Sequence, residues 1–335
     1  MTGWRRAAGV AAIAALVIAA VVVVITIGVG GSGQKHRSSP PPLPPRPAAI
    51  PAPAQGAYFG AWVKPIQYSQ AGYLQAVSDL QQQIGRRLDI VHIYLQADAN
   101  FPTTSDRAFV RQGSMLLVSW ALNNSQGIAE GHYDASIRQR AQELKALGKP
   151  VFLEWRWEMD RPNIRFQVGS PADYVAAWKH IRQVFAEEHA NNVAWVWCPT
   201  ARGFTANNAA AYYPGNDEVD WVCADVYPGP GPQRSFADVA QPFLDWAAQH
   251  PKPVMIGEFG VPQSYGPQAR AQWLRAAEQT VLSHRQIKAL VYFDSNMTGT
   301  SLQRSFALDT GTFATFRGIA DNHYFNPRGV PVSGH

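Results

Sequence analysis

Two glutamates, Glu158 and Glu258, stand at the ends of strongly apolar runs. Glu158 closes the run at 150–158, and Glu258 lies near the end of the run at 253–261. A carboxylate at the end of a buried strand costs free energy unless it is paired or takes part in chemistry. A buried ion pair with Arg156 is the structural alternative for Glu158. Two facing carboxyl groups, one protonated and one ionised, form the acid and nucleophile pair that cleaves glycosidic bonds with retention.

Apolar runs of this kind recur along the chain and predict eight β-strands. They span 57–63, 88–96, 114–120, 150–158, 193–199, 219–227, 253–261 and 287–295. Helical patterns lie between most of them. The pattern at 174–185, for example, follows Ser170 and Pro171, which suit an N-cap and a first turn. Eight strands alternating with helices predict a (β/α)8 TIM barrel. An open doubly wound sheet is the alternative, but Trp-Val-Lys-Pro at 62–65 replaces the expected Gly-rich turn.

The predicted barrel gives the two glutamates a common place. Active-site residues of such barrels come from the C-terminal ends of the strands, and Glu158 and Glu258 end the fourth and seventh. These strands lie three steps apart around the ring, so the side chains should face each other across the mouth. Retaining glycosidases need their carboxyl groups about 5–5.5 Å apart. Asp225 and Asp294 are further carboxylates near this edge, in the sixth and eighth runs.

An ordered set of motifs resembles glycoside hydrolase family 26. The set covers most of residues 57–325, and each of its members taken alone is less specific than the ordered series. The motifs are Arg156-Trp157-Glu158-Met159-Asp160, SPADYVAAWKHI at 170–181, NNVAWVWCP at 191–199, YYPGNDEVDWVCADVY at 212–227 and PVMIGEFG at 253–260.

The resemblance implies a retaining β-glycanase. That family has its acid/base on strand four and its nucleophile on strand seven, which correspond to Glu158 and Glu258. Tyr227 matches the tyrosine that hydrogen-bonds the nucleophile and favours its ionised form. The family's main activity is endo-hydrolysis of β-1,4-mannan, while some members cut mixed-linkage β-glucan or β-1,3-xylan. The resemblance therefore implies an endo-β-1,4-mannanase-like enzyme.

Several positions depart from the family pattern. Trp157 stands where His is frequent, Glu154 where Arg is usual and Asp160 where Asn is usual. Arg156 is a candidate to compensate for the missing Arg. The departures fall on substrate-shaping positions, whereas both glutamates are retained. They motivate one alternative, a carbohydrate-binding pseudoenzyme. The expected anchor and spacer motivate a second, a transglycosylase that remodels envelope glycan, and an export or structural protein that uses the barrel as a scaffold is the third.

Aromatic residues supply candidates for sugar contacts. The chain has 11 Trp and 12 Tyr, and flat rings with polar edges suit sugar-binding clefts. For any single Trp, a place in the core is the competing interpretation. His92, in the second run, is a candidate contact or a hydrogen-bonded core histidine. The candidate substrate-binding residues are Trp62, His92, Trp120, Arg156, Trp157, Trp197 and Asp225.

Charge and motif content narrow the class of function. The five basic residues of 1–55 meet no acid, and the other 24 basic residues balance the 24 acidic ones. A formally neutral body argues against a nucleic-acid partner. HExxH, other metal-ligand spacing and GxSxG are absent from the sequence, so we expect no metal and no cofactor. Cys198 and Cys223 are expected as buried free thiols, with one disulfide as the alternative.

The N-terminal part predicts attachment to a membrane. Residues 7–29 are apolar or small except for Thr26, long enough to span a bilayer and too long for the apolar core of a cleaved signal. We therefore expect a signal anchor over 1–30, a Pro-rich linker over 31–55 and the hydrolase barrel over 56–335. The expected protein is single-pass, with a monomeric extracytoplasmic domain that takes polysaccharide or oligosaccharide; secretion after cleavage is the alternative.

Overall fold

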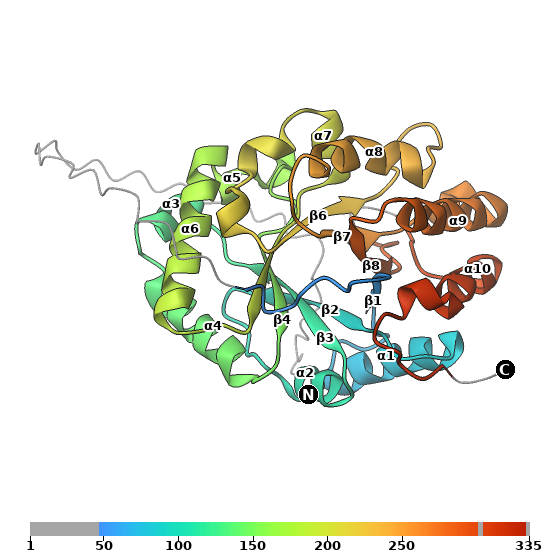
Figure 1. Cartoon of the computed structure of the whole chain (residues 1–335), viewed down its shortest axis with the longest axis horizontal. Coiled ribbons are helices and arrows are strands. Elements are labelled where there is room, and N and C mark those ends of the chain that lie inside the picture. The colour runs from blue at the N-terminus through green and yellow to red at the C-terminus, as the bar shows by residue number, and fades with distance from the viewer. Residues whose placement is uncertain (1–46, 301–303, 333–335) are drawn as a thin grey trace, which may run out of the picture.

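Eight parallel strands form a closed barrel in the computed structural model, which describes residues 47–300 and 304–332 (Figure 1). The strands pair in chain order from β1 to β8, and β8 closes the ring against β1. The (β/α)8 barrel predicted from the apolar runs is confirmed, and the open doubly wound sheet is excluded.

Each strand overlaps one of the predicted runs. The strands are β1 (Tyr58–Val63), β2 (Ile90–Gln96), β3 (Met115–Ala121), β4 (Val151–Trp155), β5 (Val193–Trp197), β6 (Trp221–Val226), β7 (Val254–Phe259) and β8 (Ile287–Asp294). β4 is shorter than its run because the chain turns after Trp155. Arg156 and Glu158 both take positive φ angles, of 48° and 51°. Glu158 therefore lies in a turn beyond the strand.

The helices lie around the ring of strands (Figure 1). They are α1 (Gln70–Ile84), α2 (Thr104–Arg111), α3 (Ser125–Ala129), α4 (Asp134–Ala146), α5 (Arg165–Val168), α6 (Pro171–Glu187), α7 (Ala201–Thr205), α8 (Phe236–Ala247), α9 (Pro267–Ser283) and α10 (Thr310–Asp321). Short 3-10 turns occupy Pro162–Ile164, Ala209–Tyr212, Asn216–Glu218, Gln263–Tyr265 and His323–Phe325. The predicted start of α6 is confirmed: Ser170 and Asp173 form a capping box and Pro171 is the first helical residue.

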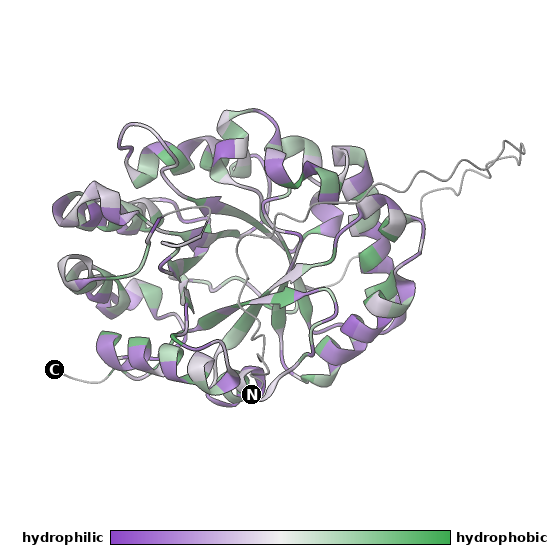
Figure 2. Ribbon diagram, turned by 180° about the vertical axis from the view of Figure 1, so that it is seen from behind, coloured by the Kyte–Doolittle hydropathy of each residue, from purple (hydrophilic) through white to green (hydrophobic). Residues whose placement is uncertain are grey.

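Side-chain alternation along the strands creates two hydrophobic cores. Outward-facing strand residues pack with the helices in the larger core. Figure 2 shows hydrophobic colour on the strands and hydrophilic colour mainly on the surrounding helices. The smaller core fills the half of the barrel in which the strands begin, called the lower half below. Its inward-facing residues include Tyr58, Ile90, Leu117, Phe152, Val196, Trp221 and Met255. The polar site therefore has only the upper half of the barrel available.

The segment before β1 closes the lower end of the barrel. Ile50 is only 3% exposed and packs into the smaller core. The Trp221 indole Nε1 donates a 3.0 Å hydrogen bond to the Ile50 carbonyl, and the Tyr58 hydroxyl donates one of 3.2 Å to the Pro51 carbonyl. The packed unit therefore begins upstream of the expected boundary at Gly56.

Most of the predicted N-terminal attachment lies outside the described residues. The signal anchor over 1–30 falls there completely, as does the linker up to residue 46. Within 47–300 and 304–332, every helix is too short or too polar to cross a bilayer.

The prediction that Cys198 and Cys223 are free thiols is wrong, because the two residues form a disulfide. β5 and β6 are neighbours in the ring, and their register places Trp197 beside Val222. The next residue of each strand is the cysteine, so the two Cα atoms lie 4.3 Å apart. Both cysteines face the barrel interior and belong to the smaller core.

The lower closure yields a stability prediction. Ile50→Ala removes buried methyl and methylene groups without a side chain able to refill the space, so we expect it to destabilise the protein by about 2–5 kcal/mol. Urea unfolding of the full chain measures the change. Gln55→Ala, at an exposed position of the same segment, should stay within about 0.5 kcal/mol of the parent. Equal unfolding midpoints for Ile50→Ala and the parent would contradict the closure.

Candidate active site

Glu258 enters the barrel mouth through an irregularity in β7. Ala224 of β6 pairs with Ile256, but the next residue, Asp225, pairs with Glu258. Gly257 is therefore an extra residue on β7, and such a bulge redirects the side chain that follows. Glu258 consequently turns inward, although alternation from Ile256 alone would not place it there.

Glycine is required at the bulge because the disulfide approaches it closely. A Cβ atom at Gly257 would lie 2.5 Å from the sulfur of Cys223 and 3.0 Å from that of Cys198. No other residue fits without moving the sulfur atoms or the strand. The disulfide and the bulge thus form one packed unit directly below Glu258.

Two tyrosines hold the Glu258 carboxylate. The Tyr227 hydroxyl donates a 2.6 Å hydrogen bond to Oε2, and the Tyr94 hydroxyl donates a hydrogen bond to Oε1. The sequence analysis identified Tyr227 and missed Tyr94. The sequence does contain a signal for Tyr94. It lies two residues after His92, so the two side chains face the same side of β2, and a candidate at His92 makes Tyr94 a candidate as well.

The ionisation of Glu258 is balanced between opposing influences. Burial raises its pKa, the nearby Glu158 charge raises it further, and the hydrogen bonds from Tyr227 and Tyr94 lower it; the resulting pKa is about 7. Burial and the Glu258 charge raise the pKa of both phenols well above 10. Both tyrosines therefore remain protonated donors when Glu258 ionises.

Glu158 is fixed in the turn that follows β4. Its backbone N–H donates to the Cys198 carbonyl at 2.8 Å, and its side chain is 13% exposed. The guanidinium of Arg161 donates to Glu158 Oε2, and the Arg161 backbone N–H donates to the Glu158 carbonyl at 3.0 Å. Arg161 was also missed, since only the left-handed turn at Glu158 brings a residue three positions later onto its carboxylate.

Aromatic rings surround the hydroxyl end of Tyr94. The centroid of the Tyr94 ring lies 5.0 Å from that of Trp62, 5.2 Å from Trp157 and 6.4 Å from Phe293. Trp62 and Trp157, two of the predicted sugar platforms, therefore lie around the tyrosine that holds Glu258; Trp157 is partly exposed, whereas Trp62 is 6% exposed. Phe293 rather than Tyr292 contributes from β8, because Tyr292 is fully buried on the outward face.

The assignment of Trp120 and Trp197 as sugar platforms is wrong. Both are fully buried in the outer core: Trp120 packs near Phe185 of α6, and Trp197 near Trp246 of α8. Strand alternation explains the correction. Ser119 points into the barrel, so its neighbour Trp120 must point toward the helices.

His92 and Asp225 lie below the mouth, where a sugar cannot reach them. His92 is 1% exposed and forms a 2.7 Å hydrogen bond with the Ser119 hydroxyl, which itself donates to Glu154. Burial lowers the His92 pKa to about 3, so the ring is neutral. The core-histidine interpretation is therefore confirmed. Asp225 is 2% exposed beside Glu258, and burial raises its pKa well above 3.8.

Arg156, the candidate to compensate for the missing family arginine, contacts Trp157. Its guanidinium lies 5.6 Å from the Trp157 ring centroid and donates to the Gln167 side chain. The position of the family arginine holds Glu154, whose pKa is raised by burial well above 4.5.

One buried group in the described part of the chain has the donor atoms of a metal site. Ligand atoms of Glu154, Cys198, Cys223 and Asp225 all lie within 4.8 Å of one another. The two sulfur atoms are joined in the disulfide, and thiolates are the form of cysteine that binds metal. With the disulfide formed, this group therefore has no thiolate with which to bind a metal.

Comparisons with known proteins agree with this geometry. Endoglucanase H of Acetivibrio thermocellus is 30% identical over 261 residues, which cover 72% of this chain and 28% of that protein. The β-1,3-xylanase TXYA of a Vibrio species is 32% identical over 159 residues, or 45% of this chain and 32% of the xylanase. The chain thus spans about a third or less of the length of these curated relatives. No protein-family model matches the chain.

Solved structures share the barrel. A GH26 β-mannanase from Bacteroides ovatus superposes with a TM-score of 0.62 at 15% identity, covering 84% of this chain and 92% of that one. The catalytic domain of the GH26 endo-β-1,4-mannanase from Bacillus sp. JAMB-750 gives 0.61 at 15% identity, with 84% and 90% covered. Fold and site therefore define a (β/α)8 barrel with a carboxylate pair at its mouth. The resemblance to glycoside hydrolase family 26 is confirmed.

The two-tyrosine contact predicts the titration of Glu258. Tyr94→Phe or Tyr227→Phe removes a hydrogen bond that stabilises the ionised carboxylate, so we expect the Glu258 pKa to rise from about 7 by about one to two pH units. Carbon-13 NMR titration of glutamate-labelled protein, with Glu258→Gln to identify the signal, measures it. Tyr68→Phe, remote from Glu258, should leave the titration unchanged. An unchanged or lower Glu258 pKa in Tyr94→Phe would contradict the contact.

Proposed function

We propose that this barrel is a retaining β-glycanase of the family 26 type, with mannanase-like chemistry. The observation that carries the proposal is the Glu258 carboxylate, which two tyrosines hold and whose pKa the neighbouring Glu158 raises. A buried, oriented carboxylate beside a second one is the equipment for double displacement at an anomeric carbon. The names of the relatives, an endoglucanase and two β-1,3-xylanases, support a β-linked polysaccharide.

The mechanism assigns one role to each glutamate. Glu258 attacks the anomeric carbon while Glu158 gives its proton to the departing glycosidic oxygen, which leaves a covalent glycosyl–enzyme. Glu158, now ionised, takes a proton from a water molecule that attacks the same carbon, and the sugar is released with net retention. Tyr94 and Tyr227 orient Glu258 for the attack. Trp62 and Trp157 offer ring faces on which a sugar can lie.

The mechanism has a defined dependence on Glu258 ionisation. The nucleophile must be ionised, and its pKa is about 7. The fraction of competent enzyme therefore rises as the pH increases through about 7, which places the acidic limb of the kcat/KM profile there.

Substitution of either glutamate tests the proposed activity. We expect Glu158→Ala to lower kcat by about 10²–10⁴-fold, because the leaving oxygen loses its proton donor. Glu258→Ala removes the group that forms the covalent intermediate and should leave no measurable turnover. The full chain in detergent is incubated with β-mannan, glucomannan, mixed-linkage β-glucan and β-1,3-xylan, and reducing ends are followed over time.

The controls separate hydrolysis from the alternatives. Glu130→Ala, at an exposed glutamate that pairs with His132, should keep full activity. Proton NMR of the first product should show the retained anomer. Longer oligosaccharides among the products would favour a transglycosylase, while binding of a glycan that is never cleaved would favour a pseudoenzyme. Turnover that survives in Glu258→Ala would overturn the assignment of the nucleophile.

We also propose that residues 1–30 anchor the protein in a membrane and that the barrel lies on the extracytoplasmic side. The proposal rests on the apolar stretch at 7–29 with arginines at 5 and 6 before it. Basic residues favour the cytoplasmic end of a spanning helix. The disulfide between Cys198 and Cys223 is consistent with an oxidising compartment.

Cell fractionation tests the anchor. The full chain should sediment with membranes and stay there in alkaline carbonate, whereas a variant without residues 1–30 should be soluble. External protease should degrade the barrel in spheroplasts if it faces outward. A soluble full-length protein with an intact N-terminus would exclude the anchor, and a shortened N-terminus would indicate a cleaved signal.

A further inference from the structure

Arg161 poses a chemical problem for the proposed mechanism. Its guanidinium donates to Glu158 Oε2 and also to Asn163 Oδ1 at 3.2 Å, and the Arg161 side chain is 37% exposed. A guanidinium beside a carboxylate pairs with the ionised form of that carboxylate. A general acid must instead carry a proton when the glycosidic bond breaks. Arg161 therefore needs another partner once substrate is bound.

The mouth supplies an excess of cationic side chains around this position. They lie on the segments between each strand and the following helix and on the short helices α5 and α7. The basic residues there, besides the buried Arg156, are Lys64, Arg161, Arg165, Arg202, Arg234 and Arg304.

The acidic residues on the same segments are mostly engaged. Asp160 accepts a 2.8 Å hydrogen bond from the Thr200 backbone N–H, and Asp309 pairs with the buried Arg270. Glu158 is the partner of Arg161, and Glu130, between β3 and α4, lies 3.7 Å from His132, which leaves Asp98 among the described residues of these segments. The loops around the mouth therefore carry more basic than acidic side chains, in contrast to the carboxyl groups inside the barrel, although the chain from residue 56 onward is formally neutral.

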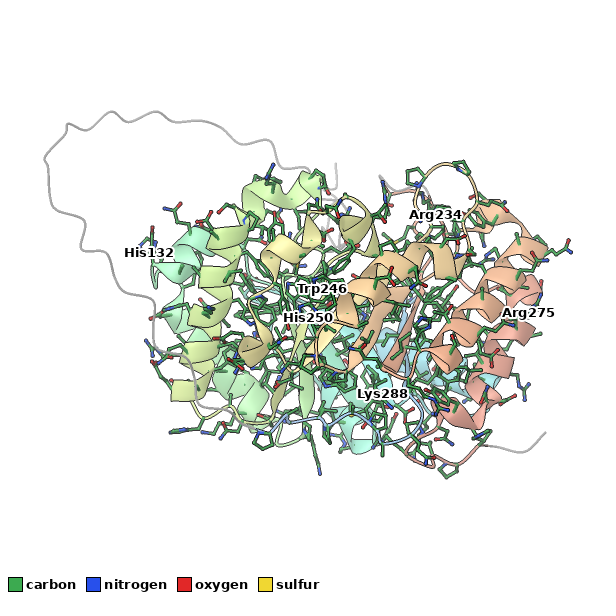
Figure 3. The ribbon with its side chains drawn as sticks, turned by 45° about the horizontal axis from the view of Figure 1, so that its top comes forward. His132, Arg234, Trp246, His250, Arg275 and Lys288 are labelled. Atoms are coloured by element: carbon green, nitrogen blue, oxygen red, sulfur yellow. A yellow bond between two sulfur atoms is a disulfide. The ribbon has the colours of Figure 1, made fainter. Side chains whose placement is uncertain are left out.

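Arg202 extends the cationic surface toward Glu258. It is exposed on α7, and a Cβ atom at Gly229 would lie 3.4 Å from its Nη1. Arg202 therefore lies against the loop that begins with Tyr227. Within residues 47–300 and 304–332, no carboxylate pairs with Arg202. Arg234, farther along the same loop, lies at the opposite end of the molecule from Lys288 (Figure 3).

We propose that the substrate is an acidic β-glycan and that a carboxylate on its leaving-group side draws Arg161 away from Glu158. This inference rests on the proposed glycanase function. The leaving-group side follows from the role of Glu158, which protonates the departing oxygen. Arg161 transfers its hydrogen bonds to the substrate carboxylate, Glu158 takes a proton from solvent, and that proton moves to the glycosidic oxygen as the bond breaks. Arg161 is thus a specificity-determining residue, and uronic-acid residues are the chemistry that it fits.

Matched pairs of glycans test the proposal. β-Mannan and mixed-linkage β-glucan are each used before and after oxidation of part of their C6 hydroxymethyl groups to carboxylates. The full chain in detergent is assayed on both forms at low and at high salt, as the parent, Arg161→Gln and Arg202→Gln. Arg275→Gln is the control of equal charge change, because Arg275 lies on the outward side of α9 (Figure 3).

We expect the parent to cleave an oxidised glycan with a kcat/KM about tenfold or more above that of its neutral form. High salt should reduce the preference. Arg161→Gln should bring the ratio close to one, because activity on the oxidised form falls while activity on the neutral form rises once no guanidinium holds Glu158 ionised; Arg275→Gln should keep the parental ratio. A purely structural role of Arg161 would lower both activities equally, and that result would overturn the proposal.

Other outcomes separate this inference from the proposed function. Equal cleavage of neutral and oxidised glycans by the parent would leave the glycanase standing and overturn the acidic substrate. If no glycan is cleaved, the glycanase fails, and affinity electrophoresis decides the remaining question. Stronger retardation in oxidised glycan that is lost in Arg161→Gln would sustain acidic recognition, while equal retardation in both forms would overturn it.

Discussion

The alternation of side chains in a closed barrel is the constraint on which the whole molecule depends. Each strand residue faces either the interior or the helices, and the ring leaves no third environment. The lower interior is filled with apolar residues that end at the disulfide. Every polar inward residue must therefore lie in the upper half, which is why Tyr94, Tyr227 and Glu258 converge there.

The upper half gathers more carboxyl groups than its polar partners can neutralise. Glu154, Asp225 and Glu258 all have pKa values raised by burial. The charges of neighbouring carboxylates add to that effect, and Glu158 contributes most to Glu258. Phenolic donors and one guanidinium stabilise the two carboxylates nearest the opening. Of the deeper ones, Glu154 accepts from the Ser119 hydroxyl and lies near the neutral His92, and burial favours the protonated form of both Glu154 and Asp225. The mouth thus places two carboxyl groups with phenolic or guanidinium donors above two carboxyl groups whose burial favours the protonated form.

Local patterns predicted the barrel and most of the site, because strand order and strand ends follow from apolar runs. Glu158 and Glu258 were found from their places at strand ends and Tyr227 from the family resemblance, while Trp120 and Trp197 were misplaced by the strand-end criterion. A position along a strand does not tell which face a residue occupies until one residue of that strand is anchored. Once Ser119 is seen inside the barrel, the face of Trp120 follows.

The remaining errors concern contacts that depend on neighbours distant in sequence. The Cys198–Cys223 disulfide depends on the register of β5 against β6. The inward turn of Glu258 depends on the extra residue at Gly257. Arg161 reaches Glu158 only because the turn after β4 adopts left-handed backbone angles. Neither strand register nor such a turn leaves a periodic signal in the sequence.

The hydrogen bond between Trp221 and Ile50 has a mechanical consequence. Because Ile50 is seated among the first residues of the strands, any tension transmitted along the preceding chain is delivered to the floor of the barrel. Glu158 and Glu258 stand at the opposite rim, separated from that point by the full length of the strands. A pull on the N-terminal segment therefore acts on the Trp221 indole and the smaller core, and it leaves the geometry of the two carboxylates unchanged.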